Sequence, residues 1–191
     1  MFWGNPDATV KFCETPYKEN DFIAEYYNTI SGFIYVIIGL LYIKQYKELA
    51  FSCISLGVGT VLLHCTQKHY AQMLDELSMI VLVYLFLNLL NNAYKKVYVI
   101  FLVGLYLYFN KNFQIFLTMF IGLVVILINE TKSLSYNKRH YKNLFIVLII
   151  IATICWLIDQ LFCNYVSGYY LHAVWHILTG ICIYIGFKIL I

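Results

Sequence analysis

The apolar residues of this 191-residue chain fall in long blocks, and this pattern constrains the fold more than any other feature. Several blocks reach about twenty residues, the length at which an α-helix spans the hydrocarbon core of a bilayer. Only 12% of the residues are charged, whereas a soluble domain carries about 25%. We therefore expect an all-α membrane protein, since helices satisfy their own backbone hydrogen bonds in lipid.

The blocks predict a seven-transmembrane-helix bundle that forms a single domain over residues 1–191. The expected helices cover residues 22–43, 49–65, 71–90, 94–109, 113–128, 144–162 and 170–190. Residues 1–21 are polar and contain both prolines of the chain, so we expect a lumenal loop rather than a cleaved signal peptide.

Lysine and arginine residues divide unevenly between the two sides of the expected membrane, nine against four. Because positive charge gathers in cytoplasmic loops, the N-terminus is expected in the lumen or outside the cell and the C-terminus in the cytosol. The sequon Asn129-Glu130-Thr131 then lies on the cytosolic side, where we expect no glycosylation. The net charge of +3 does not indicate a nucleic-acid partner.

Ionisable residues in membrane helices are costly and mark function. With this topology, His64, Asp75, His172 and His176 share one depth near the lumenal face. His172 and His176 stand at i and i+4 and project from one helix face, and His64 can supply a third nitrogen. Three histidines with an open fourth position are typical of catalytic zinc, whose bound water loses a proton near neutral pH.

A hydrolase also needs a base beside that water, and Asp75 is the candidate. Thr60 lies one turn before His64, where its hydroxyl can donate to an oxyanion. The alternative for the histidine pair alone is a polar contact between helices. His69 and His140 lie in expected loops and are predicted to be solvated.

Five stretches of the chain resemble motifs of alkaline ceramidases and occur in the family's order. They are WGNPDATVKFCETPYKENDFIAEYYNT (residues 3–29), GVGTVLLH (57–64), QMLDELSMI (72–80), WLIDQLFC (156–163) and LHAVWHILTG (171–180). The resemblance implies a seven-helix membrane hydrolase that cleaves ceramide, drawn from the bilayer, into a sphingoid base and a free fatty acid. It further implies an integral membrane protein among lipids of the endoplasmic reticulum or Golgi, as a monomer or small homo-oligomer.

The resemblance also assigns the site residues. It implies that His64, His172 and His176 are zinc ligands and that Asp75 is the catalytic acid/base. Thr60 falls where the family has serine. Threonine keeps the hydroxyl group and adds a methyl group.

A calcium site in the N-terminal loop is a further implication of the resemblance. Glu14 and Glu25 match two carboxylate ligands, and Phe12 matches a residue that offers its backbone carbonyl. Lys11 and Pro16 depart from the family's Asp and Asn, although calcium takes six to eight oxygen ligands. We therefore hypothesise that the Lys11 ammonium pairs with Glu14 and Glu25 in place of the ion.

The family pairs cysteines at the positions of Cys13 and Cys163, which implies a disulfide in an oxidising lumen. Two free thiols are the alternative reading. The remaining cysteines lie in or at the ends of apolar blocks and are expected to behave as small hydrophobes.

Three other classes of membrane protein are alternatives to a ceramidase. An adiponectin-receptor-like receptor would be expected to carry a longer cytosolic N-terminal domain and the reverse charge bias. A GPI-remodelling lipid esterase would carry a large cysteine-rich lumenal segment. A transporter would show broken helices and an internal repeat. The sequence favours the ceramidase branch over these alternatives.

Overall fold

The computed structural model describes residues 2–131 and 138–191, which form eight α-helices and one 3-10 helix without any β-strand. The elements are α1 (Tyr26–Tyr42), α2 (Lys47–Thr66), α3 (His69–Leu90), α4 (Lys96–Tyr108), α5 (Phe113–Glu130), α6 (Arg139–Leu161), α7 (Cys163–Val166), η3 (Ser167–Tyr169) and α8 (Leu171–Leu190). The predicted all-α architecture is confirmed, and each of the seven expected helices has a counterpart.

The differences from the expected helices lie at their ends. Helix α6 begins at Arg139, five residues before the apolar block that predicted it, because its polar first turn continues the helix beyond that block. Between α6 and α8 the chain adds α7 and η3, which the sequence pattern did not predict.

Five helices, α2, α3, α5, α6 and α8, are long and apolar enough to cross a membrane. Helices α1 and α4 are apolar but shorter, with 17 and 13 residues. Large apolar side chains are exposed as well as buried, such as Ile100, Phe101, Val125 and Ile150 on the outer faces of α4, α5 and α6. An exposed apolar surface of this extent is typical of contact with lipid, which indicates a membrane protein.

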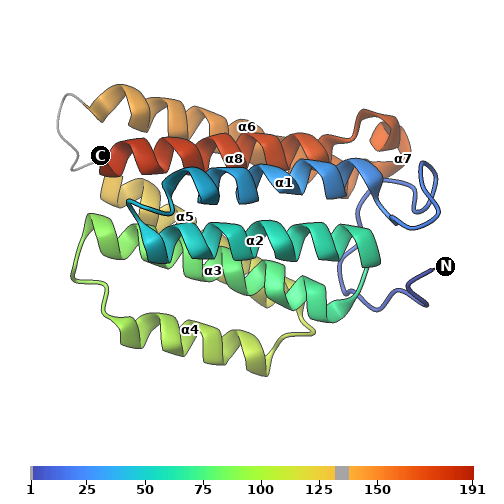
Figure 1. The fold of residues 1–191 in the computed structure, drawn as a ribbon, viewed down its shortest axis with the longest axis horizontal. Coiled ribbons are helices and arrows are strands. Elements are labelled where there is room, and N and C mark those ends of the chain that lie inside the picture. The colour runs from blue at the N-terminus through green and yellow to red at the C-terminus, as the bar shows by residue number, and fades with distance from the viewer. Residues whose placement is uncertain (1, 132–137) are drawn as a thin grey trace.

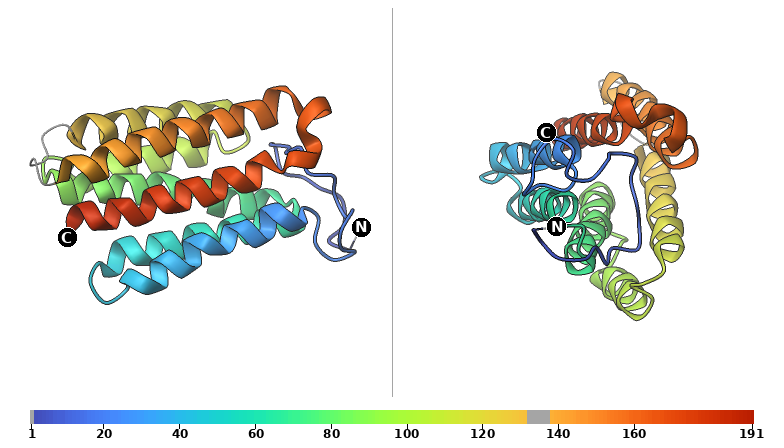
Figure 2. Two further views of the ribbon diagram at one scale, coloured as in Figure 1. Left: turned by 90° about the horizontal axis from the view of Figure 1, so that it is seen from above. Right: turned by 90° about the vertical axis from the view of Figure 1, so that its right-hand side faces the viewer.

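The long helices run along one common axis, and the two chain ends lie at opposite ends of the bundle (Figure 1). Viewed along that axis, the segment before α1 crosses the end of the bundle (Figure 2, right). This is the end at which α2 finishes and α3 and α8 begin. The N-terminal segment therefore covers the part of the bundle that carries the predicted site.

Hydrogen bonds to the N-terminal segment fix the start of α1. The Glu14 carboxylate accepts from the backbone amides of Tyr27 and Asn28, at 2.7 and 2.9 Å. First-turn amides have no partner within a helix, and a carboxylate there also interacts favourably with the helix dipole. The backbone amide of Glu25 donates to the His64 carbonyl at 2.9 Å, so the same segment is tied to α2.

Candidate active site

The three predicted histidine ligands converge at the covered end of the bundle. Each of His64, His172 and His176 offers one nitrogen, and these nitrogens lie within 4.8 Å of one another. All three side chains are buried. No other group of three or more histidine, cysteine or acidic side chains within residues 2–131 and 138–191 is placed to hold a metal ion.

Hydrogen bonds orient two of the three imidazoles. Nδ1 of His64 bonds to a carboxylate oxygen of Glu25 at 2.5 Å, and Nδ1 of His176 bonds to the Ser31 hydroxyl at 2.7 Å. In both rings, this leaves Nε2 for the centre of the cluster. Nδ1 of His172 is buried and has no partner among the described residues. A buried nitrogen without a partner, beside two rings held by a carboxylate and a hydroxyl, fits a metal-binding cluster.

The Phe12 ring covers this cluster from the N-terminal segment. Its centroid lies 4.6 Å from that of His64 and 4.0 Å from that of His172. Cys13, the next residue, is joined to Cys163 by a disulfide, and its backbone amide donates to Asp159 of α6. The disulfide implied by the family resemblance is therefore present, and it holds Phe12 over the histidines.

Asp75 and Thr60 form a hydrogen-bonded pair between α3 and α2. The Thr60 hydroxyl also lies 2.8 Å from the carbonyl of Leu56, its second possible acceptor. Gly59 permits this approach, because a Cβ atom there would lie 2.6 Å from the Asp75 amide nitrogen. The close packing of α2 on α3 thus brings together the two side chains predicted as base and oxyanion donor.

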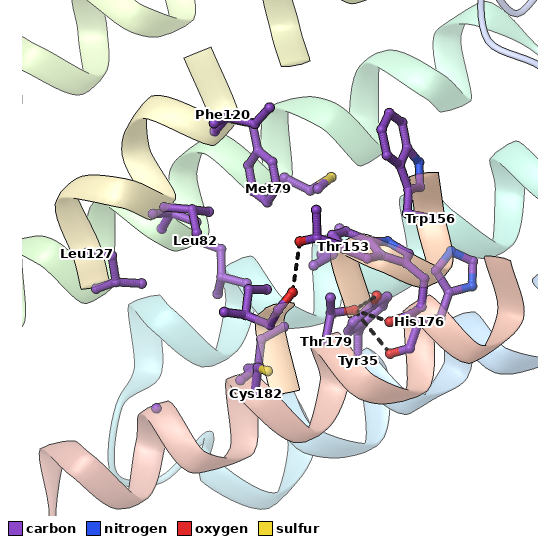
Figure 3. A pocket seen from close by; sticks show the side chains of 18 of the residues that line it. Tyr35, Met79, Leu82, Phe120, Leu127, Thr153, Trp156, His176, Thr179 and Cys182 are labelled. Carbon is purple, nitrogen blue, oxygen red and sulfur yellow. Dashed lines mark hydrogen bonds between the residues drawn. The ribbon is translucent and has the colours of Figure 1, made fainter. Parts of the chain in front are cut away.

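A cavity of about 530 Å³ opens from this site and runs through the bundle. Thr60, Asp75, His172 and His176 line one end of the cavity, and nearly all of the remaining lining is apolar. Figure 3 shows part of this lining, with His176 and Trp156 near the polar end and Leu127 further along. A buried polar centre at one end of a long apolar cavity fits a lipid with a polar group and hydrocarbon chains.

The residues present do not fit the calcium site that the family resemblance implies. Both Glu14 oxygens accept backbone amides, and Glu25 accepts from His64, Asn28 and Gln67. Burial raises the pKa of the Glu14 carboxyl above its ordinary value, because the amide bonds only partly offset the loss of water. Asn28 Oδ1 is buried without a partner, but it stands beside two carboxylates that already accept protein donors, whereas calcium takes six to eight oxygen ligands.

The hypothesis that Lys11 replaces calcium is wrong. The Lys11 side chain is exposed, and within residues 2–131 and 138–191 it forms no ion pair with Glu14 or Glu25. The two carboxylates instead obtain their hydrogen-bond donors from α1, α2 and the loop after α2, as described above.

Several supporting residues were not predicted for the roles that they have. Ser31 orients His176, Glu25 orients His64, and Phe12 contacts the cluster through its ring rather than its carbonyl. Ser31 lies in the first apolar block and has no pattern that marks it. Ser31 is half-buried, and a serine hydroxyl within an apolar block is the signal that could have drawn attention to it.

The fold and the site together define a helical membrane protein with a buried three-histidine centre and a lipid-sized cavity. The chain belongs to the Ceramidase family, whose model matches residues 4–191. It is 27% identical to "Alkaline ceramidase" of Arabidopsis thaliana, over 92% of this chain and 80% of that protein. It is 26% identical to "Putative alkaline ceramidase dcd3A" of Dictyostelium discoideum, over 99% of this chain and 87% of that protein. "Alkaline ceramidase 3" of Mus musculus is 24% identical, over 96% of this chain and 83% of that protein.

Proposed function

We propose that this protein is a ceramidase that hydrolyses the amide bond of ceramide within the membrane, using a zinc ion held by His64, His172 and His176. The observation that carries the proposal is the convergence of three ligand nitrogens at the polar end of the apolar cavity, beside the Asp75–Thr60 pair. The products are a sphingoid base and a free fatty acid.

We place all seven longer helices across the membrane, with the N-terminal segment on the lumenal side of the endoplasmic reticulum or Golgi. Two observations support this placement. The termini lie at opposite ends of the bundle, which an odd number of crossings requires (Figure 1). The nine-against-four division of cationic residues supports a cytosolic C-terminal end.

The donor set suits zinc, which binds imidazole nitrogen and keeps an open position in catalytic sites. Zinc held there supplies acidified water and polarises a carbonyl oxygen. Glu25 and Ser31 hold His64 and His176 in their ring orientations. Phe12 excludes bulk water from the cluster, since its ring lies against two of the three histidines.

Asp75 moves the proton in the proposed reaction. It takes a proton from the attacking water and returns it to the nitrogen of the leaving sphingoid base. Thr60 has one hydroxyl proton and two acceptors, Asp75 and the Leu56 carbonyl. When Asp75 is ionised, Thr60 donates to it. Once Asp75 is protonated, Thr60 can accept from Asp75 and donate to Leu56, or donate to the oxyanion of the tetrahedral intermediate.

The lipid enters the cavity between α5 and α6. Helix α5 packs on α3 and α6 packs on α8, and the two helices make few contacts with each other over the residues described. Ile121 and Val125 of α5 and Ile150 and Ile154 of α6 line the cavity and are also exposed on the outer surface. Residues with both properties mark an opening, and their apolar side chains suit passage from the bilayer.

Release of fatty acid from a panel of ceramides tests the proposal, with the purified protein in detergent and zinc content measured in parallel. We expect the parent to release fatty acid and Asp75→Asn to retain zinc while losing turnover. His140→Gln is a matched control, because His140 is exposed and lies far along the chain from the cluster. Absence of release by a folded, zinc-loaded parent would reject the proposal in favour of another lipid substrate or a receptor.

A further inference from the structure

Several hydroxyl groups line the cavity beyond the histidines, and two of them are hydrogen-bonded to each other. These two belong to Tyr35 of α1 and Thr179 of α8, both of which line the cavity, and their oxygens are 2.6 Å apart. Both side chains are buried, with 4% and 9% exposed. Figure 3 shows them together beside His176.

The hydrogen bonds of the pair assign its protons. The Thr179 hydroxyl lies 2.7 Å from the carbonyl of Trp175, to which it donates its single proton. Tyr35 must therefore be the donor in the contact with Thr179. Each oxygen then keeps a free lone pair, because a hydroxyl can accept two hydrogen bonds and donate one. The pair can thus accept a hydrogen bond from a ligand.

The position of the pair relative to the histidines limits which part of a ligand it can meet. Thr179 follows His176 by three residues on α8, which places it about 4.5 Å further along the helix axis. Tyr35 follows Ser31, the partner of His176, by four residues on α1, or about 6 Å. A lipid whose amide lies at the histidines would therefore meet the pair within the first few carbons of one chain.

A purely structural role accounts poorly for two hydroxyls at this place. Thr179 already satisfies its proton on its own helix, so it does not need Tyr35. Phenylalanine and valine would fill the same volume without burying polar atoms, and such paired replacement is often nearly neutral for stability. Both hydroxyl protons are satisfied within the protein, but each oxygen keeps an acceptor lone pair that faces an apolar cavity without a donor.

We infer that Tyr35 and Thr179 form a receptor for a hydroxyl group carried by a lipid chain close to its amide, and that they select hydroxylated over unsubstituted chains. The inference rests on the proposed function for the location of the amide. Two chains of a ceramide can carry such a group: the sphingoid base at its carbon 3, or the acyl chain at its carbon 2. The chemistry recognised is the same in both cases.

Equilibrium binding of two matched pairs of product lipids tests the inference without depending on turnover. One pair is a sphingoid base and its 3-deoxy analogue, and the other is a long-chain fatty acid and its 2-hydroxy derivative. We expect the parent to bind the hydroxylated member of one pair about 3- to 10-fold more tightly, the usual worth of one hydrogen bond. The pair that shows the preference identifies the chain.

Tyr35→Phe and Thr179→Val should each bring the ratio of the affinities for the hydroxylated and the unsubstituted lipid close to one. Tyr108→Phe and Thr118→Val are matched controls, because both side chains are exposed and neither lines the cavity. A parent without preference in either pair, or a preference unchanged in both cavity variants, would overturn the inference. If the preference is found but the parent cleaves no ceramide, the receptor stands and the proposed function fails.

Discussion

Nδ1 of His64 and the carboxylate of Glu25 form a hydrogen bond of 2.5 Å between α2 and the residue that precedes α1. Both side chains are buried, and Gln67 donates to the second oxygen of the same carboxylate at 2.8 Å. The contact fixes the ring of His64 and leaves its other nitrogen facing the cluster.

Replacing Glu25 should therefore weaken metal binding although Glu25 is not itself a proposed ligand. We expect Glu25→Ala to lower zinc affinity about 10- to 100-fold, the usual effect of removing a carboxylate behind a histidine ligand. Competition with a chelator, followed by measurement of bound zinc, provides the readout. Glu19→Ala is the control, since Glu19 is exposed and pairs with Lys18 on the surface. Unchanged affinity in Glu25→Ala would show that His64 does not bind zinc through this arrangement.

We expect the hydroxyl group of Thr60 to be needed for ceramide hydrolysis, and its methyl group not to be needed. Thr60→Val removes the donor to Asp75 at almost constant volume, and we expect kcat to fall about 100-fold, as for loss of an oxyanion donor. Thr60→Ser keeps the donor and should retain most of the activity, with a small loss of stability because the methyl group packs against Gly32. Equal activity of the valine and serine variants would remove Thr60 from the mechanism.

The close approach of α2 to α3 predicts a strong effect of a single methyl group. In Gly59→Ala, the new Cβ would lie 2.6 Å from the Asp75 amide nitrogen and 2.8 Å from its Cα, so one helix must move. We expect a loss of about 1–3 kcal/mol in stability, together with a loss of turnover from the displaced Asp75. Thermal unfolding in detergent and ceramide turnover are the measurements. Gly122→Ala on α5, where nothing lies within 4 Å, should be tolerated.

The disulfide between Cys13 and Cys163 should help to retain the metal. Without it, the segment carrying Phe12 loses its covalent tie to the start of α7, and we expect the histidines to become more accessible to water. We expect Cys13→Ser to lower stability by about 2–4 kcal/mol and to speed the release of zinc to a chelator. Cys155→Ser, at a free and half-buried cysteine, should leave the rate unchanged. Identical release rates for both variants would contradict this role.

Large side chains placed at the proposed opening between α5 and α6 should obstruct the entry of lipid without altering the histidine cluster. We expect Ile150→Trp and Val125→Trp to lower kcat/KM for long-chain ceramides more than for short-chain, water-dispersed ones, because only the former must pass from the bilayer. Ile100→Trp on α4 is the control, since Ile100 is exposed but does not line the cavity. An equal effect on both kinds of substrate would place the entrance elsewhere.

The sequence determined the seven longer helices because each of them corresponds to a local, contiguous feature, an apolar block of sufficient length. It also indicated the histidine cluster, because the alternation of helix direction brings the end of α2 and the start of α8 to one face of the bundle. His172 and His176 at i and i+4 needed no tertiary information. The order of the helices thus determined which ionisable residues share a depth.

The tertiary structure alone decided which neighbours these residues have. Glu25 could have been a ligand of calcium or a partner of His64, and only the packing of the segment before α1 against α2 assigned it to the histidine. Lys11 does not pair with the two carboxylates, which accept hydrogen bonds from backbone amides and other side chains instead. Tyr35 meets Thr179 across 144 positions of the chain. Such contacts depend on the rotation and spacing of whole helices, which no local sequence pattern specifies.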